Sequence, residues 1–306
     1  MSYQVENIAE YQGHTGSLYA LAADQQTARA FTSGDDGIVA EWQLDRPEVS
    51  GKGLLQVDSA VYALEWIEEW NWLAVGMSDG TLYLMDPASQ KLVHTTRKIT
   101  EPIYGLKYEE DRHYLWMLYG KGYVQILKLP ACEEVGFRKI ADNHLRAIVF
   151  SKGESAVYFG ASDQHILRMD SQSGDLSHTW KAHENSVFSL AMHPQKHYLI
   201  SGGRDAHLNL WSAKAPFQNI RKIPAHNFTI NAIAFSPDEK YVMTGSRDKT
   251  LKLWDTGSFN LLKVIDWKRN NGHKHSVNRL IWMNDGTILS AGDDRRLIRW
   301  RLHVRE

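Results

Sequence analysis

The sequence predicts an all-β protein, a β-propeller of seven four-stranded antiparallel sheets. Three observations predict it. A short motif, seen clearly as GSRDKTLKLWD at 245–255, recurs seven times along the 306 residues. The copies lie about 43 residues apart. Each period contains short segments, such as INAIAF, YVMTGS and TLKLWD, in which alternate residues are apolar. Alternation of this kind indicates β-strands, and four strands per repeat of 40–45 residues is typical of a propeller blade.

The repeats fill the chain. The turn position of the motif is occupied by Asp36, Asp79, Lys121, Asp163, Asp205, Asp248 and Asp294, with successive spacings of 43, 42, 42, 42, 43 and 46 residues. This regular series leaves no room for a second domain. We therefore expect a single domain over residues 1–306, with blades near 12–54, 55–97, 98–139, 140–181, 182–224, 225–269 and 270–306 plus 1–11.

The composition narrows the possible partners and the cellular compartment. The formal net charge is −1, from 35 Lys and Arg against 36 Asp and Glu, so no broad positive surface exists for nucleic acid or an anionic membrane. Cys132 is the single cysteine, which fits a reducing compartment. The first residues lack the features of a signal peptide, and no run of 18 apolar residues occurs. We expect a cytoplasmic protein with no nucleic-acid or membrane partner.

Four repeats carry four polar residues at constant spacing. A His lies 21 or 22 residues before the Asp, a hydroxyl residue lies four before it, and a Trp lies six after it. The four sets are His14, Thr32, Asp36 and Trp42; His183, Ser201, Asp205 and Trp211; His226, Thr244, Asp248 and Trp254; and His273, Ser290, Asp294 and Trp300.

On these residues, the chain resembles the WD40-repeat family over essentially its full length. The resemblance implies that each set is a buried hydrogen-bonded tetrad. Such a network favours one strand register only when every member has a partner. Blades 2, 3 and 4 fit that requirement because their members are lost together, with Val57, Ile99 and Ala141 at the His position, Val75, Met117 and Phe159 at the hydroxyl position, and Met85, Leu127 and Met169 at the Trp position. A catalytic triad is the less favoured reading, since one enzyme does not need four.

The N-terminal segment is predicted to complete the last blade. Trp300 lies only six residues from the end, so blade 7 lacks a fourth strand after its third. Residues 3–11 precede His14, where an outer strand belongs. As is common in the family, pairing the two termini in one sheet would remove an open strand edge. The alternative is a frayed tail.

A partner-binding surface is predicted from the strand that follows each His. Position +4 from the His is always apolar and position +7 is always Leu or Ile, so both are expected to be buried, with a bulge between them. Position +5 is large or polar, and the resemblance places it, with the residue before the Asp, around the top of the central channel. These residues are Tyr19, Tyr62, Tyr104, Arg146, Phe188, Asn231, Asn278, Asp35, Arg204, Arg247 and Asp293.

Tyr and Arg are enriched where proteins bind one another. The sequence therefore predicts a non-catalytic interaction scaffold, whose partner is a protein or peptide carrying an acidic or phosphorylated group. The alternative is a purely structural role, in which the tyrosines close the channel and the arginines pair with local Asp. We expect a monomer, or one member of a larger complex.

The sequence contains no motif that indicates a catalytic or metal-binding site. No nucleotide-binding, nucleophile-elbow or zinc-protease motif occurs, and His273 with His275 is too few ligands for a metal. We expect no catalytic residue, cofactor or metal. The alternative is a propeller enzyme of the hydrolase or lactonase type with a metal in its channel. Trp70 is a candidate for a second interface on the bottom face, and His193 and His197 are expected on the surface.

Overall fold

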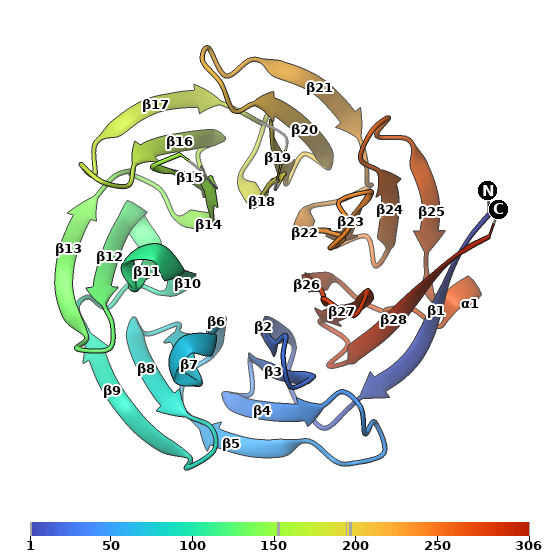
Figure 1. Ribbon diagram of the computed structural model, residues 1–306, viewed down its shortest axis with the longest axis horizontal. Helices are drawn as coiled ribbons and strands as arrows, with labels where there is room; N and C mark the ends of the chain where they lie inside the picture. Colours follow the sequence, from blue (N-terminus) through green and yellow to red (C-terminus); the bar gives the residue numbers. More distant parts are fainter. Residues whose placement is uncertain (1, 152–153, 194, 196–197, 306) are drawn as a thin grey trace. The chain divides into compact units, whose positions relative to one another are not determined.

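The computed structural model describes residues 2–151, 154–193, 195 and 198–305. Within these ranges the strands form seven four-stranded antiparallel sheets, so the predicted fold class, a seven-bladed β-propeller, is confirmed (Figure 1). Each sheet is one blade. Residues between the strands form short turns, and fourteen non-glycine residues with positive φ, such as Ala28 and Gln90, lie among the described residues of these connections.

The strands of the first four blades follow the repeats of the sequence. Blade 1 holds β2 (Leu18–Asp24), β3 (Arg29–Gly34), β4 (Ile38–Gln43) and β5 (Lys52–Gln56). Blade 2 holds β6 (Val61–Ile67), β7 (Trp72–Met77), β8 (Thr81–Asp86) and β9 (Lys91–Arg97). Blade 3 holds β10 (Ile103–Glu109), β11 (Tyr114–Tyr119), β12 (Tyr123–Lys128) and β13 (Glu133–Lys139). Blade 4 holds β14 (Leu145–Ser151), β15 (Ala156–Ala161), β16 (His165–Asp170) and β17 (Leu176–Lys181).

The last three blades continue the series. Blade 5 holds β18 (Val187–Met192), β19 (Tyr198–Gly203), β20 (His207–Ser212) and β21 (Asn219–Pro224). Blade 6 holds β22 (Ile230–Phe235), β23 (Tyr241–Ser246), β24 (Leu251–Asp255) and β25 (Leu261–Ile265). Blade 7 holds β26 (Val277–Trp282), β27 (Thr287–Gly292), β28 (Leu297–Arg305) and β1 (Ser2–Tyr11).

The N-terminal strand completes blade 7, as predicted. β1 pairs antiparallel with β28, and the sheet has the order β1-β28-β27-β26. Val5 of β1 is 2% exposed and joins a core cluster with Trp300 and Leu253. Apolar burial of this kind attaches the first strand to the blade through side chains as well as through backbone hydrogen bonds.

The predicted bulge in the first strand of a blade is also present. The register of β2 with β3 shifts between Leu18 and Ala20, and the same shift occurs in blades 3, 4, 5 and 7. The bulge lets Ile103 and Leu106, at positions +4 and +7, both be buried although they are three residues apart. The expected burial at +7 is incomplete, because Ile148, Leu190 and Ile233 are only half-buried.

The contacts between residues divide the chain into two compact units. The first unit comprises Met1–Trp66 and Asn231–Glu306, and the second comprises Ile67–Ile230. The first unit has a core cluster around Trp42, Leu18 and Leu289. The second has one around Trp116 and Phe159 and another around Tyr158 and Trp211.

Short helices occupy connections where the sequence analysis expected only turns. The α-helix α1 (Trp267–Asn270) is capped by Asp266, whose side chain accepts the backbone N–H of Arg269. Its four residues are too few to show a helical period. The 3-10 helices are η1 (Glu68–Trp70), η2 (Glu110–Arg112) and η3 (Gly120–Gly122). No helix in the described ranges is long and apolar enough to span a bilayer.

The expectation for His193 was wrong. Its side chain is buried, at 3% exposure, with its ring centroid 4.7 Å from that of Tyr198. The neighbouring proline and polar residues suggested a surface turn, but the imidazole packs against Tyr198 at the start of β19. His197 lies outside the described residues.

Candidate partner-binding surface

The His, hydroxyl, Asp and Trp residues are joined by hydrogen bonds in three blades. In blade 1, His14 Nδ1 lies 2.9 Å from Asp36 Oδ2, and His14 Nε2 lies 2.8 Å from Thr32 Oγ1. The indole of Trp42 donates to the same hydroxyl at 2.6 Å. Blade 5 has the same connections among His183, Ser201, Asp205 and Trp211, and blade 7 has them among His273, Ser290, Asp294 and Trp300.

Blade 6 contains the same residue types. Trp254 Nε1 donates to Thr244 Oγ1 at 3.0 Å, and His226 is buried. Asp248 accepts the backbone N–H and the hydroxyl of Thr250, at 3.0 and 2.6 Å. These contacts lie within the turn that precedes β24.

The carboxylates of the tetrads are kept ionised by their partners. Burial acts to raise the pKa of Asp205, but hydrogen bonds from His183 and from the backbone of Glu184 outweigh it and lower that pKa to about 2. The pKa of Asp294 is likewise lowered, because the hydrogen bond from His273 outweighs the effect of burial. An ionised carboxylate is the better acceptor for the imidazole N–H. In blades 1, 5 and 7 all four side chains are therefore linked by hydrogen bonds, an arrangement that favours stability.

The blades without tetrads contain different hydrogen bonds. In blade 3, the Tyr119 hydroxyl donates to Gln125 Oε1 at 2.7 Å, and Gln125 Nε2 donates to Glu134 Oε2 at 2.7 Å. Burial raises the pKa of Tyr119, which keeps its hydroxyl protonated as a donor. In blades 2 and 4, Asp79 and Asp163 accept backbone N–H groups of Thr81 and His165 in their turns.

Three predicted binding residues meet in the second unit. Tyr104, Arg146 and Phe188 are each the second residue of the first strand of blades 3, 4 and 5. The guanidinium carbon of Arg146 lies 4.1 Å from the Tyr104 ring centroid and 5.4 Å from that of Phe188. Arg146 Nε also donates to Ser162 Oγ at 3.1 Å. The cation is therefore fixed between two aromatic faces.

Charged neighbours surround this cluster. The His144 ring is 5.3 Å from that of Tyr104, and His144 Nδ1 accepts the backbone N–H of Lys121 at 3.2 Å. Burial and the positive charge of Arg146 lower the pKa of His144, so its imidazole is neutral at physiological pH. Lys121 forms an ion pair with Glu101 at 2.6 Å. Glu101 was not singled out from the sequence, where an acidic residue directly before Pro102 was the only available signal.

Five of the predicted binding residues of the first unit fall into two groups. The rings of Tyr19 and Tyr62 lie 5.6 Å apart, and burial together with Asp35 raises the pKa of Tyr19. The other group is internally paired. Asn231 Nδ2 donates to Ser276 Oγ at 3.1 Å, and Asn278 Nδ2 donates to Asp293 Oδ1 at 2.7 Å and to the Leu18 carbonyl at 2.8 Å.

The remaining predicted residues lie at the surface of their own units. The side chains of Arg204, in the second unit, and of Arg247 and Asp35, in the first, are exposed. The backbone N–H of Arg204 donates to Ser186, and that of Asp35 donates to Ser17. The two arginines thus keep their guanidinium groups in contact with solvent, each within its unit.

Trp70, the candidate for a second interface, is only half-exposed. Its ring centroid lies 5.7 Å from Trp72, 5.8 Å from Tyr108 and 5.5 Å from His113. Glu69 accepts the Tyr108 hydroxyl at 2.9 Å and lies 2.9 Å from His113. Most of the indole is therefore used in packing within blades 2 and 3.

In the part of the chain that the structure describes, no three His, Cys, Asp or Glu side chains form a group that could hold a metal ion.

Arg279, the large residue at a position that is small in the other blades, has two backbone partners in the first unit. It donates to the carbonyls of Tyr62 at 3.0 Å and Asn278 at 3.3 Å.

Comparisons with known proteins agree with the repeat pattern. Residues 174–212, 217–255 and 266–301 match the model of the WD40 family, described as "WD domain, G-beta repeat". The chain is 24% identical over 247 residues to striatin-3 of Mus musculus, a match that covers 74% of this chain and 31% of that protein. It is 22% identical over 235 residues to striatin of Homo sapiens, covering 70% and 30%. The chain thus spans about a third of the length of these curated relatives.

A solved structure shares the fold. The WD40 β-propeller domain of Doa1 superposes with a TM-score of 0.85 at 15% sequence identity, covering 97% of this chain and 96% of that one. At this identity the likeness shows the architecture, and the site must be argued from this chain's own residues.

Proposed function

Because the chain is a WD40-repeat β-propeller protein, we propose that it is a non-catalytic scaffold that binds a protein or peptide partner. We assign the partner-binding surface to the cluster of Tyr104, Arg146 and Phe188, and we place an acidic group of the partner on Arg146. The observation that carries the proposal is the arginine held between two aromatic rings. A cation that is already ordered loses little conformational entropy on binding, and the half-buried aromatic rings beside it supply apolar contact.

The chemistry of the cluster suits a carboxylate or a phosphate. Arg146 Nε donates to Ser162, and a guanidinium presents its N–H groups in a planar fork whose geometry matches either anion. The exposed Arg204 lies in the same unit and adds positive charge. The near-neutral net charge argues against nucleic acid as the partner.

The test compares two double variants in affinity capture from native lysate. Arg146→Gln with Phe188→Ala removes the cation and one ring. Lys222→Gln with Ile220→Ala removes a cation and an apolar side chain from the exposed strand β21 and serves as the matched control. We expect partners retained by the wild type and the control to be lost from the first variant. An identical set of captured proteins for all three would refute the assignment.

Treating the lysate with phosphatase shows whether the partner binds through a phosphate or through a carboxylate. A partner that is lost after treatment uses a phosphate, and one that is retained uses a carboxylate.

The single cysteine fits a reducing compartment, so we further propose a cytoplasmic location, which fluorescence imaging of the tagged chain would test.

A further inference from the structure

A cavity of about 380 Å³ lies between blade 3 and the β16–β17 hairpin of blade 4, within the second unit. Its floor is formed by apolar side chains of Trp116, Val124, Ile126 and Met169. Its rim carries Arg112, Arg138 and the hairpin residues 171–174. This volume falls in the range of small-molecule sites, about 300–1,000 Å³.

The corresponding space between blades 4 and 5 is filled by three aromatic rings. Trp211, the tetrad indole of blade 5, lies 5.9 Å from Trp180 of β17. Phe217, at the positive-φ turn of the next hairpin, stacks on Trp180 with centroids 5.4 Å apart and planes 7° apart. These rings cover the apolar face of blade 4 around Tyr158 and Ile166.

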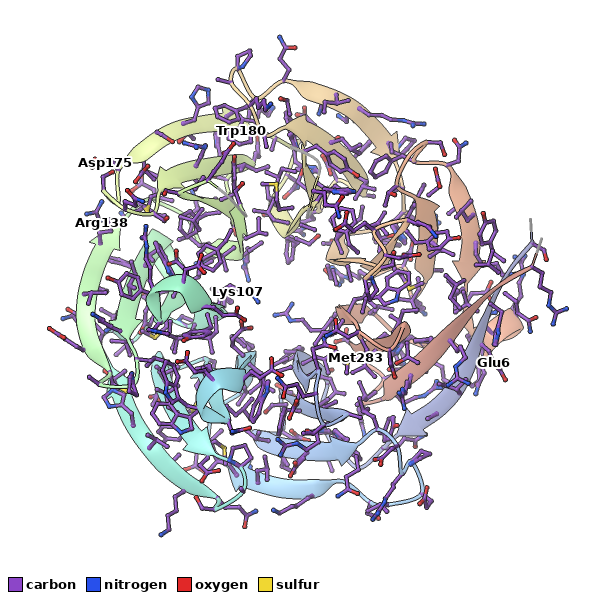
Figure 2. The ribbon with its side chains drawn as sticks, viewed as in Figure 1. Glu6, Lys107, Arg138, Asp175, Trp180 and Met283 are labelled. Carbon is purple, nitrogen blue, oxygen red and sulfur yellow. The ribbon has the colours of Figure 1, made fainter. Side chains whose placement is uncertain are left out.

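Blade 3 and blade 4 have smaller or polar residues at the same three positions. Met169 lies six residues after Asp163, as Trp211 lies six residues after Asp205. Arg138 and Trp180 also occupy equivalent positions. Each pairs with the second residue of its blade's third strand, which is Val124 for Arg138 and Ile166 for Trp180. Gly174 has positive φ and closes its hairpin as Phe217 does. Two indoles and a phenyl ring are therefore replaced by Arg, Met and Gly, and the cavity lies where those rings would be. Figure 2 shows Arg138 on β13 and Asp175 directly before β17 at this edge of the second unit.

The rim of the cavity is positively charged. Arg138 Nη1 donates to the Gly174 carbonyl and Arg112 Nη1 donates to the Ser171 carbonyl, so backbone acceptors hold both guanidinium groups at the hairpin. Glu109 lies 3.8 Å from Arg112 and also accepts the Trp116 indole at 3.0 Å. Arg138 forms no ion pair with any residue in the described ranges, and each guanidinium retains N–H groups for an anion.

We propose that this cavity is a binding site for a planar aromatic carboxylate. The ring would lie against Tyr114, Ile126 and Gly136, which line the cavity together with the buried Trp116 and Met169, in the space that Trp180 and Phe217 occupy at the next blade. The carboxylate would accept hydrogen bonds from Arg138 and, at the other side of the rim, from Arg112. Aromatic stacking and a charge-assisted hydrogen bond together account for both the shape and the charge of the cavity.

The test is calorimetric titration of the full chain with indole-3-acetate as the probe. We expect saturable binding at one site and at least tenfold weaker binding of the neutral amide, indole-3-acetamide. Arg138→Gln is expected to weaken binding of the acid about tenfold or more. Lys139→Gln is the matched control, because it removes the same charge from the next residue of β13, whose side chain points to the opposite face and pairs with Asp142.

A second variant blocks the cavity without removing charge. A Cβ on Gly136 would lie 3.4 Å from Ile126 Cδ1, an ordinary contact, so Gly136→Leu fills the space without backbone strain. We expect this variant to keep the wild-type melting temperature within a few degrees and to lose binding of the probe. Absence of saturable binding to the wild type would overturn the proposal, as would equal affinity in wild type, Arg138→Gln and Gly136→Leu.

Discussion

At the scale of single residues, the fixed spacing of His, hydroxyl, Asp and Trp predicted four tetrads, and hydrogen bonds join the members of three of them, in blades 1, 5 and 7. Their geometry follows from one hydroxyl that serves the imidazole and the indole together, as Thr32 does for His14 and Trp42. The Tyr119–Gln125 network of blade 3 was not predicted, because it occurs once and so leaves no repeated pattern. The position of Arg146 was predicted, but its place between Tyr104 and Phe188 depends on side-chain directions that spacing does not give.

Removing one tetrad hydroxyl is expected to destabilise the fold. Ser290→Ala leaves the Trp300 indole and the His273 Nε2 without their partner, and both side chains are buried. An unsatisfied buried polar group costs about 1–3 kcal/mol, so the free energy of unfolding should fall by roughly that amount in urea denaturation. Ser50→Ala, at an exposed position, is the control and should leave it unchanged. A Ser290→Ala protein as stable as the control would show that the shared hydroxyl contributes little.

The lowered pKa of Asp205 predicts acid sensitivity. The pKa is about 2 in the folded chain, below the value of about 3.9 for an unfolded chain. The stabilisation is therefore present above about pH 4 and is lost as the pH falls towards about 2. Asp205→Asn should lower the free energy of unfolding at neutral pH and make its decline between about pH 4 and about pH 2 less steep. Asp175→Asn, at an exposed position, is the control, and equal slopes in both variants would contradict the assignment.

At the scale of elements, strand positions, bulges and the pairing of β1 with β28 were all predictable. Alternation of apolar residues marks a strand because one face is buried, and a spacing of three between two buried positions marks a bulge. The helix α1 was not predictable in the same way. It occupies the longest repeat, between Asp248 and Asp294, where extra residues have no counterpart in the other blades.

The first strand is expected to contribute to stability through Val5. Val5→Ala removes buried apolar volume beside Trp300, and the expected loss is roughly 2 kcal/mol in the free energy of unfolding. Gln4→Ala is the matched control, since Gln4 is the preceding residue of β1 and is exposed. Equal stability of the two variants in thermal or urea denaturation would mean that β1 is attached by its backbone alone.

At the scale of the whole molecule, repetition made the fold predictable. Because the pattern recurs seven times at regular spacing, a blade can be identified even where its own copy of the motif is incomplete. Blades 2 to 4 were recognised in this way although their tetrads are absent. Function does not benefit from repetition in the same way, because a binding surface depends on the differences between blades. Arg146 and Phe188 differ from Tyr104 at one repeated position, and the three become a cluster only through contact within the second unit.

The most direct test of the account is hydrogen exchange, measured by mass spectrometry, on the chain alone and bound to a captured partner. Binding at the proposed surface should slow amide exchange in peptides that contain residues 102–105, 144–147 and 186–189. Protection restricted to the outer strands β13, β17 and β21, with no change in those three segments, would contradict it.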